Sequence, residues 1–290
     1  MFNVTLRFCA FVGILLCSNL AVAENMTGGD LPEQGFSYFL GLGQIQTRYQ
    51  ESPSILPVKS TVKSSSLILI SGALYALNRD FLFSIDNLST FYPATSTESW
   101  NATGPTFNGI NLTSPLLQQN SYSLSQSSTQ LLLHYRVQGQ WFVIGGPSFV
   151  SHSFKRYSFV IGPDNAVSTP GSTTVEETSS EVLLNMGVEL ESEQVLNRPD
   201  HYGLRFSVGL PVWRRLQNTS VPQYDFTSAR GYDLSLDGRY SWAIRKDVQI
   251  GAWGRLSTSY RGNQIIGTTI EMPSSRLDSF GYGLELLWKL

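Results

Sequence analysis

The segment GYDLSLDGRYSW, residues 231–242, alternates between apolar and polar side chains. Its apolar members are Tyr232, Leu234, Leu236, Tyr240 and Trp242. Its polar members are Asp233, Ser235, Asp237, Arg239 and Ser241. Because successive side chains of a β-strand point to opposite faces, this alternation predicts a strand with one apolar and one charged face. What each face meets decides the fold.

The composition differs from that of an ordinary soluble domain. Only 14% of the 290 residues are charged, while 41% are hydrophobic. Typical soluble domains carry about 25% charged residues. The net charge is −2, so no basic field favours nucleic acid, and we predict no nucleic-acid partner.

The first 23 residues have the three parts of a secretory signal peptide. Arg7 precedes an apolar run at 8–17, and the small-residue sequence Ala-Val-Ala at 21–23 supplies a cleavage site. Both cysteines of the chain lie inside the apolar run, and cysteine-free export fits a bacterial envelope protein. We therefore predict a signal peptide over 1–23, followed by a short periplasmic segment over 24–35.

After residue 23, no stretch of 18 consecutive residues is apolar. The sequence therefore predicts no transmembrane helix. A chain of this kind is either soluble or crosses a membrane as a closed barrel, since only a closed sheet satisfies every backbone group in lipid.

The alternation of 231–242 recurs along the chain. The extended segments that we predict are 36–49, 65–78, 80–92, 127–139, 141–154, 180–195, 201–214, 229–243, 246–260 and 277–290. The connections alternate in length: the long polar ones are 50–64, 93–126, 155–179, 215–228 and 261–276, and the others are tight turns. Long loops at one end of a sheet and short turns at the other are typical of membrane barrels. We predict an all-β fold, a transmembrane antiparallel up-and-down β-barrel over 36–290, with about ten strands in a range of eight to twelve.

Aromatic residues support the barrel. At the short-turn ends of the strands lie Trp141, Tyr202, Tyr240, Trp242 and Trp288. At the long-loop ends lie Tyr49, Phe91, Tyr92, Tyr232, Tyr260 and Phe280. Two aromatic belts with aliphatic residues between them are typical of a protein that meets two membrane interfaces. A water-soluble β-sandwich with these aromatics in its core is the alternative, but it would not require the alternation of loop lengths.

Over residues 36–290 the chain resembles bacterial outer-membrane β-barrel proteins. The most specific part is the last strand, GYGLELLWKL at 281–290. Trp288 and Leu290 occupy the positions where the family keeps an aromatic and a terminal hydrophobic residue, although Leu290 replaces the usual Phe. The resemblance implies an outer-membrane location, contact with outer-membrane lipid, and recognition of this strand by the barrel-assembly machinery. We also expect a monomer.

With apolar faces toward lipid, the charged faces meet the lumen, because a cation on the lipid face costs about 2–4 kcal/mol at the bilayer midplane. The predicted lumen charge network is Arg136, Glu189, Glu191, Arg205, Asp233, Asp237, Arg239, Arg255 and Glu285. A barrel of this size is narrow enough for side chains to fill. We therefore predict a largely plugged lumen and a structural or surface-interaction role. The alternative is a narrow porin-like channel for small solutes or ions.

Enzymatic activity is a third class, and we predict no activity, cofactor or metal. The strand count is also that of the omptin proteases, which need paired aspartates and an Asp-His pair at the extracellular rim. His201 follows Asp200 at a short turn, which is the wrong end, and His134 is expected to face the lumen. His152, between two serines, is the candidate for a hydrolase, but adjacent strand residues point to opposite faces. The long loops, above all 93–126, are the expected place for an extracellular ligand.

Overall fold

The computed structural model describes residues 36–78, 80–168, 170–192, 200–245, 247–267 and 270–289. The predicted signal peptide, the segment 24–35 and Leu290 lie outside these described residues. Residues 34–290 form one compact unit. Within the described ranges, no helix has the length and apolar character needed to cross a membrane.

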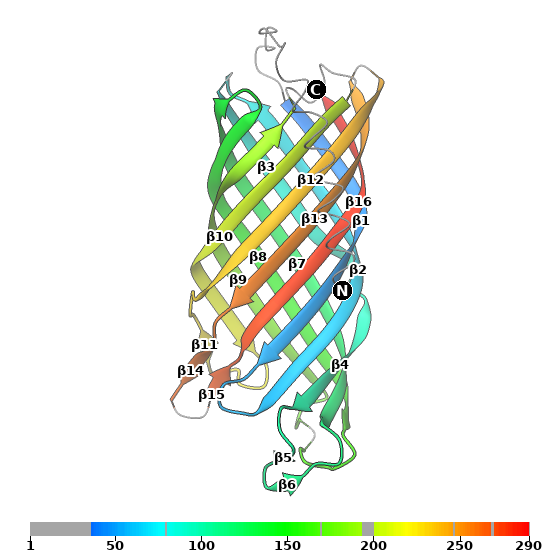
Figure 1. Ribbon diagram of the computed structural model, residues 1–290, viewed down its shortest axis with the longest axis vertical. Helices are drawn as coiled ribbons and strands as arrows, with labels where there is room; N and C mark the ends of the chain where they lie inside the picture. The colour runs from blue at the N-terminus through cyan, green and yellow to red at the C-terminus, as the bar shows by residue number, and fades with distance from the viewer. Residues whose placement is uncertain are drawn as a thin grey trace. The chain divides into compact units, whose positions relative to one another are not determined.

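Long antiparallel strands close into a ring (Figure 1). In chain order they are β1 (Phe36–Ser52), β2 (Val58–Ala76), β3 (Phe81–Tyr92), β7 (Leu116–Gln138), β8 (Trp141–Ile161), β9 (Thr174–Glu191), β10 (Asp200–Asn218), β12 (Gly231–Arg245), β13 (Val248–Arg261) and β16 (Ser274–Lys289). Each strand pairs with the next, and β16 closes the ring by pairing with β1. The prediction of an up-and-down barrel of about ten strands is confirmed.

Several strands extend far beyond their predicted ends on the long-loop side. β7 has 23 residues and β8 has 21, so the prediction that all of 93–126 and 155–179 is loop was wrong. In β7, the side chains of Asn120, Tyr122 and Leu124 are buried, whereas alternate serines face outward. The period of two therefore continues above the membrane, where the outward face meets water and needs no apolar side chains.

β4 (Thr95–Ala102) continues β3 and does not add a hairpin to the ring. It lies between β2 and β7, the same two strands that flank β3. Pro93 separates the two halves, since proline has no N–H to donate to the ladder. The remaining short strands lie in the connections at the same end (Figure 1): β5 (Thr106–Phe107), β6 (Ile110–Asn111), β11 (Asp225–Phe226), β14 (Gln264–Ile266) and β15 (Ile270–Met272).

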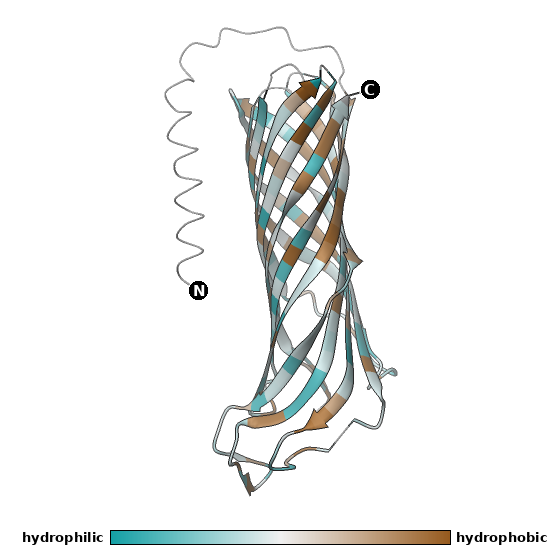
Figure 2. Ribbon diagram, turned by 90° about the vertical axis from the view of Figure 1, so that its right-hand side faces the viewer, coloured by the Kyte–Doolittle hydropathy of each residue, from teal (hydrophilic) through white to brown (hydrophobic). Residues whose placement is uncertain are grey.

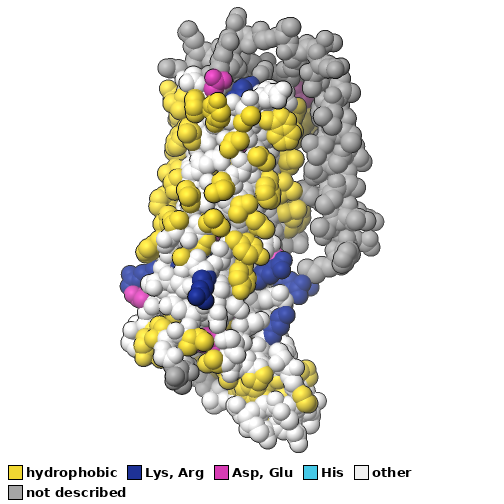
Figure 3. Space-filling model, turned by 60° about the vertical axis from the view of Figure 1, so that its left-hand side comes forward, with side chains coloured by type: hydrophobic (Ala, Val, Ile, Leu, Met, Phe, Trp, Pro, Cys, Tyr) yellow, Lys and Arg dark blue, Asp and Glu magenta, His cyan; other side chains and the backbone are white. Residues whose placement is uncertain are grey.

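The outward face of the strands forms an apolar belt. Hydrophobic and hydrophilic residues alternate along the strands (Figure 2), and hydrophobic side chains cover the barrel wall (Figure 3). The exposed members on β9 are Leu184, Met186 and Val188. Of the predicted belt aromatics, Trp141 and Trp242 are about half exposed. Such an outward surface suits contact with acyl chains.

Tyr49 is a correction to the predicted belt. Its side chain is 1% exposed and turns into the barrel. On β1 the outward positions at this height are polar, namely Gln46, Arg48 and Gln50. The strand has already left the membrane there, so its aromatic side chain packs inside and not against lipid.

Candidate functional site in the barrel lumen

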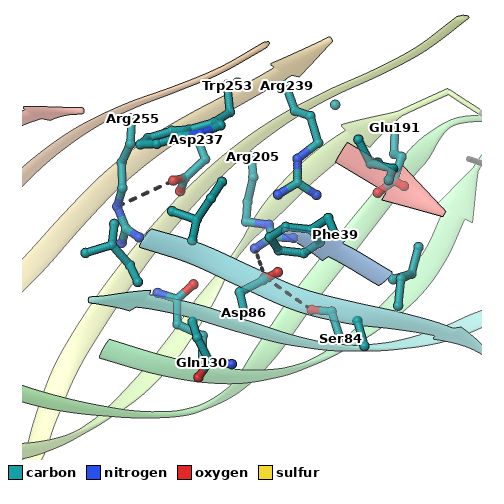
Figure 4. Close-up of a pocket in the computed structure, with 18 of the residues that line it drawn as sticks. Phe39, Ser84, Asp86, Gln130, Glu191, Arg205, Asp237, Arg239, Trp253 and Arg255 are labelled. Atoms are coloured by element: carbon teal, nitrogen blue, oxygen red, sulfur yellow. Dashed lines mark hydrogen bonds and ion pairs between the residues drawn. The ribbon is translucent and has the colours of Figure 1, made fainter. Parts of the chain in front are cut away.

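An ion-pair network crosses the lumen at the height of the apolar belt (Figure 4). The Arg205 guanidinium on β10 bridges two carboxylates, with Nη1 2.6 Å from Asp86 Oδ2 and Nη2 3.0 Å from Glu189 Oε1. Glu189 Oε2 lies 2.5 Å from His134 Nδ1, and His134 Nε2 lies 2.9 Å from Ser84 Oγ. Because β10 and β3 are not neighbours in the ring, the bond between Arg205 and Asp86 ties opposite walls together.

Two further ion pairs involve the segment 231–242. Arg239 Nε lies 2.9 Å from Glu285 Oε1, and its guanidinium lies 4.1 Å from the centroid of the Phe39 ring. Arg255 Nε lies 3.4 Å from Asp237 Oδ1. The charged face of the segment therefore looks into the lumen, while its apolar face forms part of the outer belt.

Two cavities lie among these groups. The lower one has a volume of about 110 Å³, with Phe39 and Trp253 among its walls (Figure 4). The second has about 70 Å³, and His152 and Asp233 lie beside its many serines. Both are large enough to hold water. Leu88, Ser128, Gln130 and Arg255 border both cavities.

The ring of Trp253 lies over glycines in the facing strands. A Cβ atom at Gly43 would lie 2.6 Å from Trp253 Cζ2, and one at Gly281 would lie 3.2 Å from Cζ3. Neither position can carry a side chain without moving the indole. The glycines of the β1 segment FLGLGQ thus make room for the aromatic wall of the lower cavity.

Above the belt, aromatic and aliphatic side chains close the lumen. The ring centroids of Tyr49 and Phe154 are 4.6 Å apart, and those of Tyr49 and Tyr122 are 6.0 Å apart. Val62, Leu124 and Leu277 complete this cluster, which we name the aromatic layer. Since Tyr49 is on β1 and Phe154 is on β8, which do not pair, the contact spans the lumen.

Buried charges lie beside the aromatic layer. Arg156 Nε is 2.7 Å from Glu98 Oε2, and Arg156 Nη2 is 3.1 Å from Glu51 Oε2. The Tyr49 hydroxyl donates a hydrogen bond to Glu51. We name Glu51, Glu98 and Arg156 the upper triad. Its side chains are at most 7% exposed, so water screens their attraction little.

Glu98 lies on β4, outside the membrane-spanning segments. Burial alone would raise the pKa of its carboxyl. The Arg156 guanidinium and hydrogen bonds from Ser60 and Asn120 outweigh burial and hold this pKa below its ordinary value. Glu98 is therefore held as a carboxylate.

The structure brings most of the predicted lumen charges together. Glu189 joins Arg205, Glu285 joins Arg239, and Asp237 joins Arg255. Asp233 borders the upper cavity. Glu191 pairs with His201, at 3.1 Å from Oε1 to Nε2. Arg136 lies apart, where Nη1 donates to the Gly139 carbonyl oxygen at 2.8 Å.

Sequence reasoning missed Asp86 and the upper triad. Asp86 alternates with Ser84 and Leu88 on the inward face of β3, a signal that was present in the sequence. Glu51, Glu98 and Arg156 lay in ranges that were predicted as loops. Their shared inward face becomes visible only when the strands are extended.

The histidines differ in part from the predictions. His201 lies within β10 with its side chain buried against Glu191, and not in a turn. His152 borders the upper cavity with its ring 5.8 Å from that of Phe154. The neighbouring Ser153 hydroxyl donates to Glu176 Oε1 at 2.8 Å. In the part of the chain that the structure describes, no three His, Cys, Asp or Glu side chains form a metal site.

No protein-family model matches the chain, and no curated protein matches it. Among solved structures, it is similar to the outer-membrane protease OmpT from Escherichia coli, with a TM-score of 0.64 and 9% identity over 91% of this chain and 99% of that chain. It also matches the outer-membrane protein OprG from Pseudomonas aeruginosa, with a TM-score of 0.36 and 8% identity over 89% and 97% of the two chains. At this identity the likeness to OmpT shows a shared fold. The closed ring, the apolar outer belt and this shared fold identify the chain as a bacterial outer-membrane β-barrel protein.

Proposed function

We propose that the protein is an occluded barrel, which anchors a folded extracellular extension and conducts no solute. The observation that carries this proposal is that side chains meet across the lumen at two heights. Arg205 meets Asp86 in the lower lumen. In the upper lumen, Tyr49 meets Phe154 and Arg156 meets Glu51.

The energetics of buried charge support a permanent closure. Separating Arg156 from Glu51 and Glu98 would leave unpaired charges in a dry environment, at a cost of about 3–5 kcal/mol. The contact between Tyr49 and Phe154 would be lost in the same movement. An opening of the upper lumen is therefore rare at equilibrium.

The extracellular extension supports a role at the cell surface. Val58, Ala102, Phe107, Leu117 and Ala166 form a buried cluster at its tip. Phe107, in the range 93–126, is only 6% exposed. This range therefore packs onto neighbouring strands, and a recognition surface of fixed shape on a rigid scaffold is a common site of binding.

Single-channel recording in planar bilayers tests the proposal. We expect no discrete conductance steps from the wild type. The double variant Tyr49→Ala/Phe154→Ala removes two rings of the aromatic layer and should produce steps. The matched control, Tyr232→Ala/Phe280→Ala, removes two rings from the outer face and should stay silent. Circular dichroism checks that all three proteins are folded.

A narrow channel is the alternative function. The two cavities are stacked and share four lining residues, which favours a water-filled path below the aromatic layer. Discrete steps from the wild type would contradict occlusion and support this channel. Asp237→Asn or Arg239→Gln should then change its ion selectivity, because both side chains border the lower cavity.

A hydrolase is a lower alternative. OmpT is a protease, and His152 lies near Asp233 at the upper cavity. Hydrolysis of a peptide or lipid that His152→Ala abolishes would revive it.

A further inference from the structure

Basic side chains gather at the margin of the apolar belt, toward the extracellular end of the barrel (Figure 3). On three adjacent strands, β16, β1 and β2, the outward positions there include Arg276, Arg48, Lys63 and Lys59. We name these four residues the basic face. Lys59, Lys63 and Arg276 are exposed.

The strand register places the basic face directly above the belt. Phe280, a belt aromatic on β16, lies opposite Gln46 on β1. The next outward row consists of Asp278, Arg48 and Lys63, which lie opposite one another across β16, β1 and β2. The basic face thus begins one outward step beyond the apolar surface, at the height where lipid headgroups meet a membrane barrel.

The basic face has an excess of positive charge. Against its four cations stands Asp278, which accepts a hydrogen bond from Arg276 Nε at 2.8 Å. Among the described residues, no carboxylate lies within ion-pair distance of the Lys59 or Lys63 ammonium groups. Arg48 and Lys63 are directly opposite, and like charges in that position repel. An anion bound between them would relieve the repulsion.

Outward cations elsewhere at this height have acidic neighbours. Arg215 on β10 pairs with Asp225 at 2.9 Å. Lys155 on β8 lies opposite Glu176 in the register of β8 and β9. The uncompensated charge is therefore concentrated on one side of the barrel.

We propose that the basic face binds the phosphate groups of an anionic lipid headgroup in the outer leaflet of the membrane. Phosphate oxygens accept strong charge-assisted hydrogen bonds from Lys and Arg side chains. A headgroup comes to this height together with its acyl chains, which the belt below already contacts. A soluble acidic protein would have to reach the same side chains along the bilayer surface, so a lipid is the better fit.

The test measures the affinity of the full-length protein in neutral detergent for lipid A, a phosphorylated glycolipid. In the triple variant Lys59→Gln/Lys63→Gln/Arg276→Gln we expect binding at least about tenfold weaker, since each cation near an anionic surface contributes about fivefold. The matched control is Lys155→Gln/Arg215→Gln, which removes outward cations that have acidic neighbours. It should bind within about twofold of the wild type. Circular dichroism confirms that both variants keep the barrel.

Further arms distinguish the sources of phosphate. Weaker binding of dephosphorylated lipid A, and failure of excess inorganic phosphate to displace the lipid, would support a lipid-borne phosphate. Displacement by inorganic phosphate would overturn the lipid as the source. Equal affinity for dephosphorylated lipid A, or an unchanged triple variant, would overturn the proposal. Tighter binding of a polyglutamate peptide than of lipid A would replace the lipid by an acidic protein partner.

Discussion

At the height of the apolar belt, ion-paired side chains of the lumen keep part of their surface open: 28% for Arg239 and Asp237, and 20% for Arg255. Above the belt, Arg156 is 7% exposed and Glu98 is fully buried. The lower pairs border cavities, whereas the upper triad packs beside aromatic rings. The barrel is thus hydrated inside where lipid surrounds it, and dry inside where water surrounds it.

This contrast places the closure of the lumen outside the membrane. In the lower lumen, water in the cavities can screen a charge that loses its partner. In the upper lumen, only another side chain can compensate a buried charge. Equivalent substitutions in the two regions should therefore have unequal costs.

The largest effect is expected from Arg156→Met. It leaves the Glu51 and Glu98 carboxylates buried without their cation, and should lower the free energy of unfolding by about 3–5 kcal/mol. Urea unfolding in lipid vesicles, followed by tryptophan fluorescence, measures the change. The triple variant Arg156→Met/Glu51→Gln/Glu98→Gln removes the charges together and should recover most of the loss. A single variant within about 1 kcal/mol of the wild type would show that the upper lumen is hydrated too.

A smaller effect is expected in the pH dependence of Glu98→Gln. The pKa of the Glu98 carboxyl is lower in the folded protein than its ordinary value of 4.5. The unfolded chain therefore binds the proton more tightly, and this contribution to stability is present above pH 4.5 and lost as the pH falls through the folded-state pKa. Below pH 4.5, the wild type should lose stability more steeply than E98Q, by up to about 1.4 kcal/mol per pH unit. Unfolding curves at a series of pH values would disagree with this origin if the two slopes were equal.

The smallest effect is expected from Arg255→Gln in the lower lumen. Its pair with Asp237 is long, at 3.4 Å, and both side chains are partly open. The free energy of unfolding should fall by less than about 1 kcal/mol. Asp237→Asn is the reciprocal variant and should behave in the same way under the same urea titration. A loss as large as that for Arg156→Met would erase the difference between the two regions.

The barrel and the lumen-facing charges could be predicted because lipid imposes a strict rule on each strand. In 231–242, every apolar side chain faces outward, and Asp237 and Arg239 turn inward. A period of two with one apolar face is legible without any knowledge of partners. The ring closure followed from the loop lengths.

The upper interior could not be predicted because the polarity of the two faces reverses at the membrane boundary. On β2, Leu67 and Leu69 face outward, whereas Val62 faces inward and Lys63 outward. A search for continuous apolar-out alternation ends at this reversal and assigns the remainder to loops. Pairs across the lumen, such as Asp86 with Arg205, depend on the closed ring and on no local pattern.

The interruption of β3 and β4 at Pro93 affects how the wall carries load. On either side of it, hydroxyl groups accept hydrogen bonds: Gln126 N donates to Thr90 Oγ1 at 3.0 Å, and Ala94 N donates to Ser66 Oγ at 3.1 Å. Since these bonds replace regular ladder partners, a pull on the extension is passed to the adjacent β2 and β7 through short side chains. The wall therefore has a built-in compliant seam, about which the tip can tilt while the cylinder in the bilayer keeps its shape.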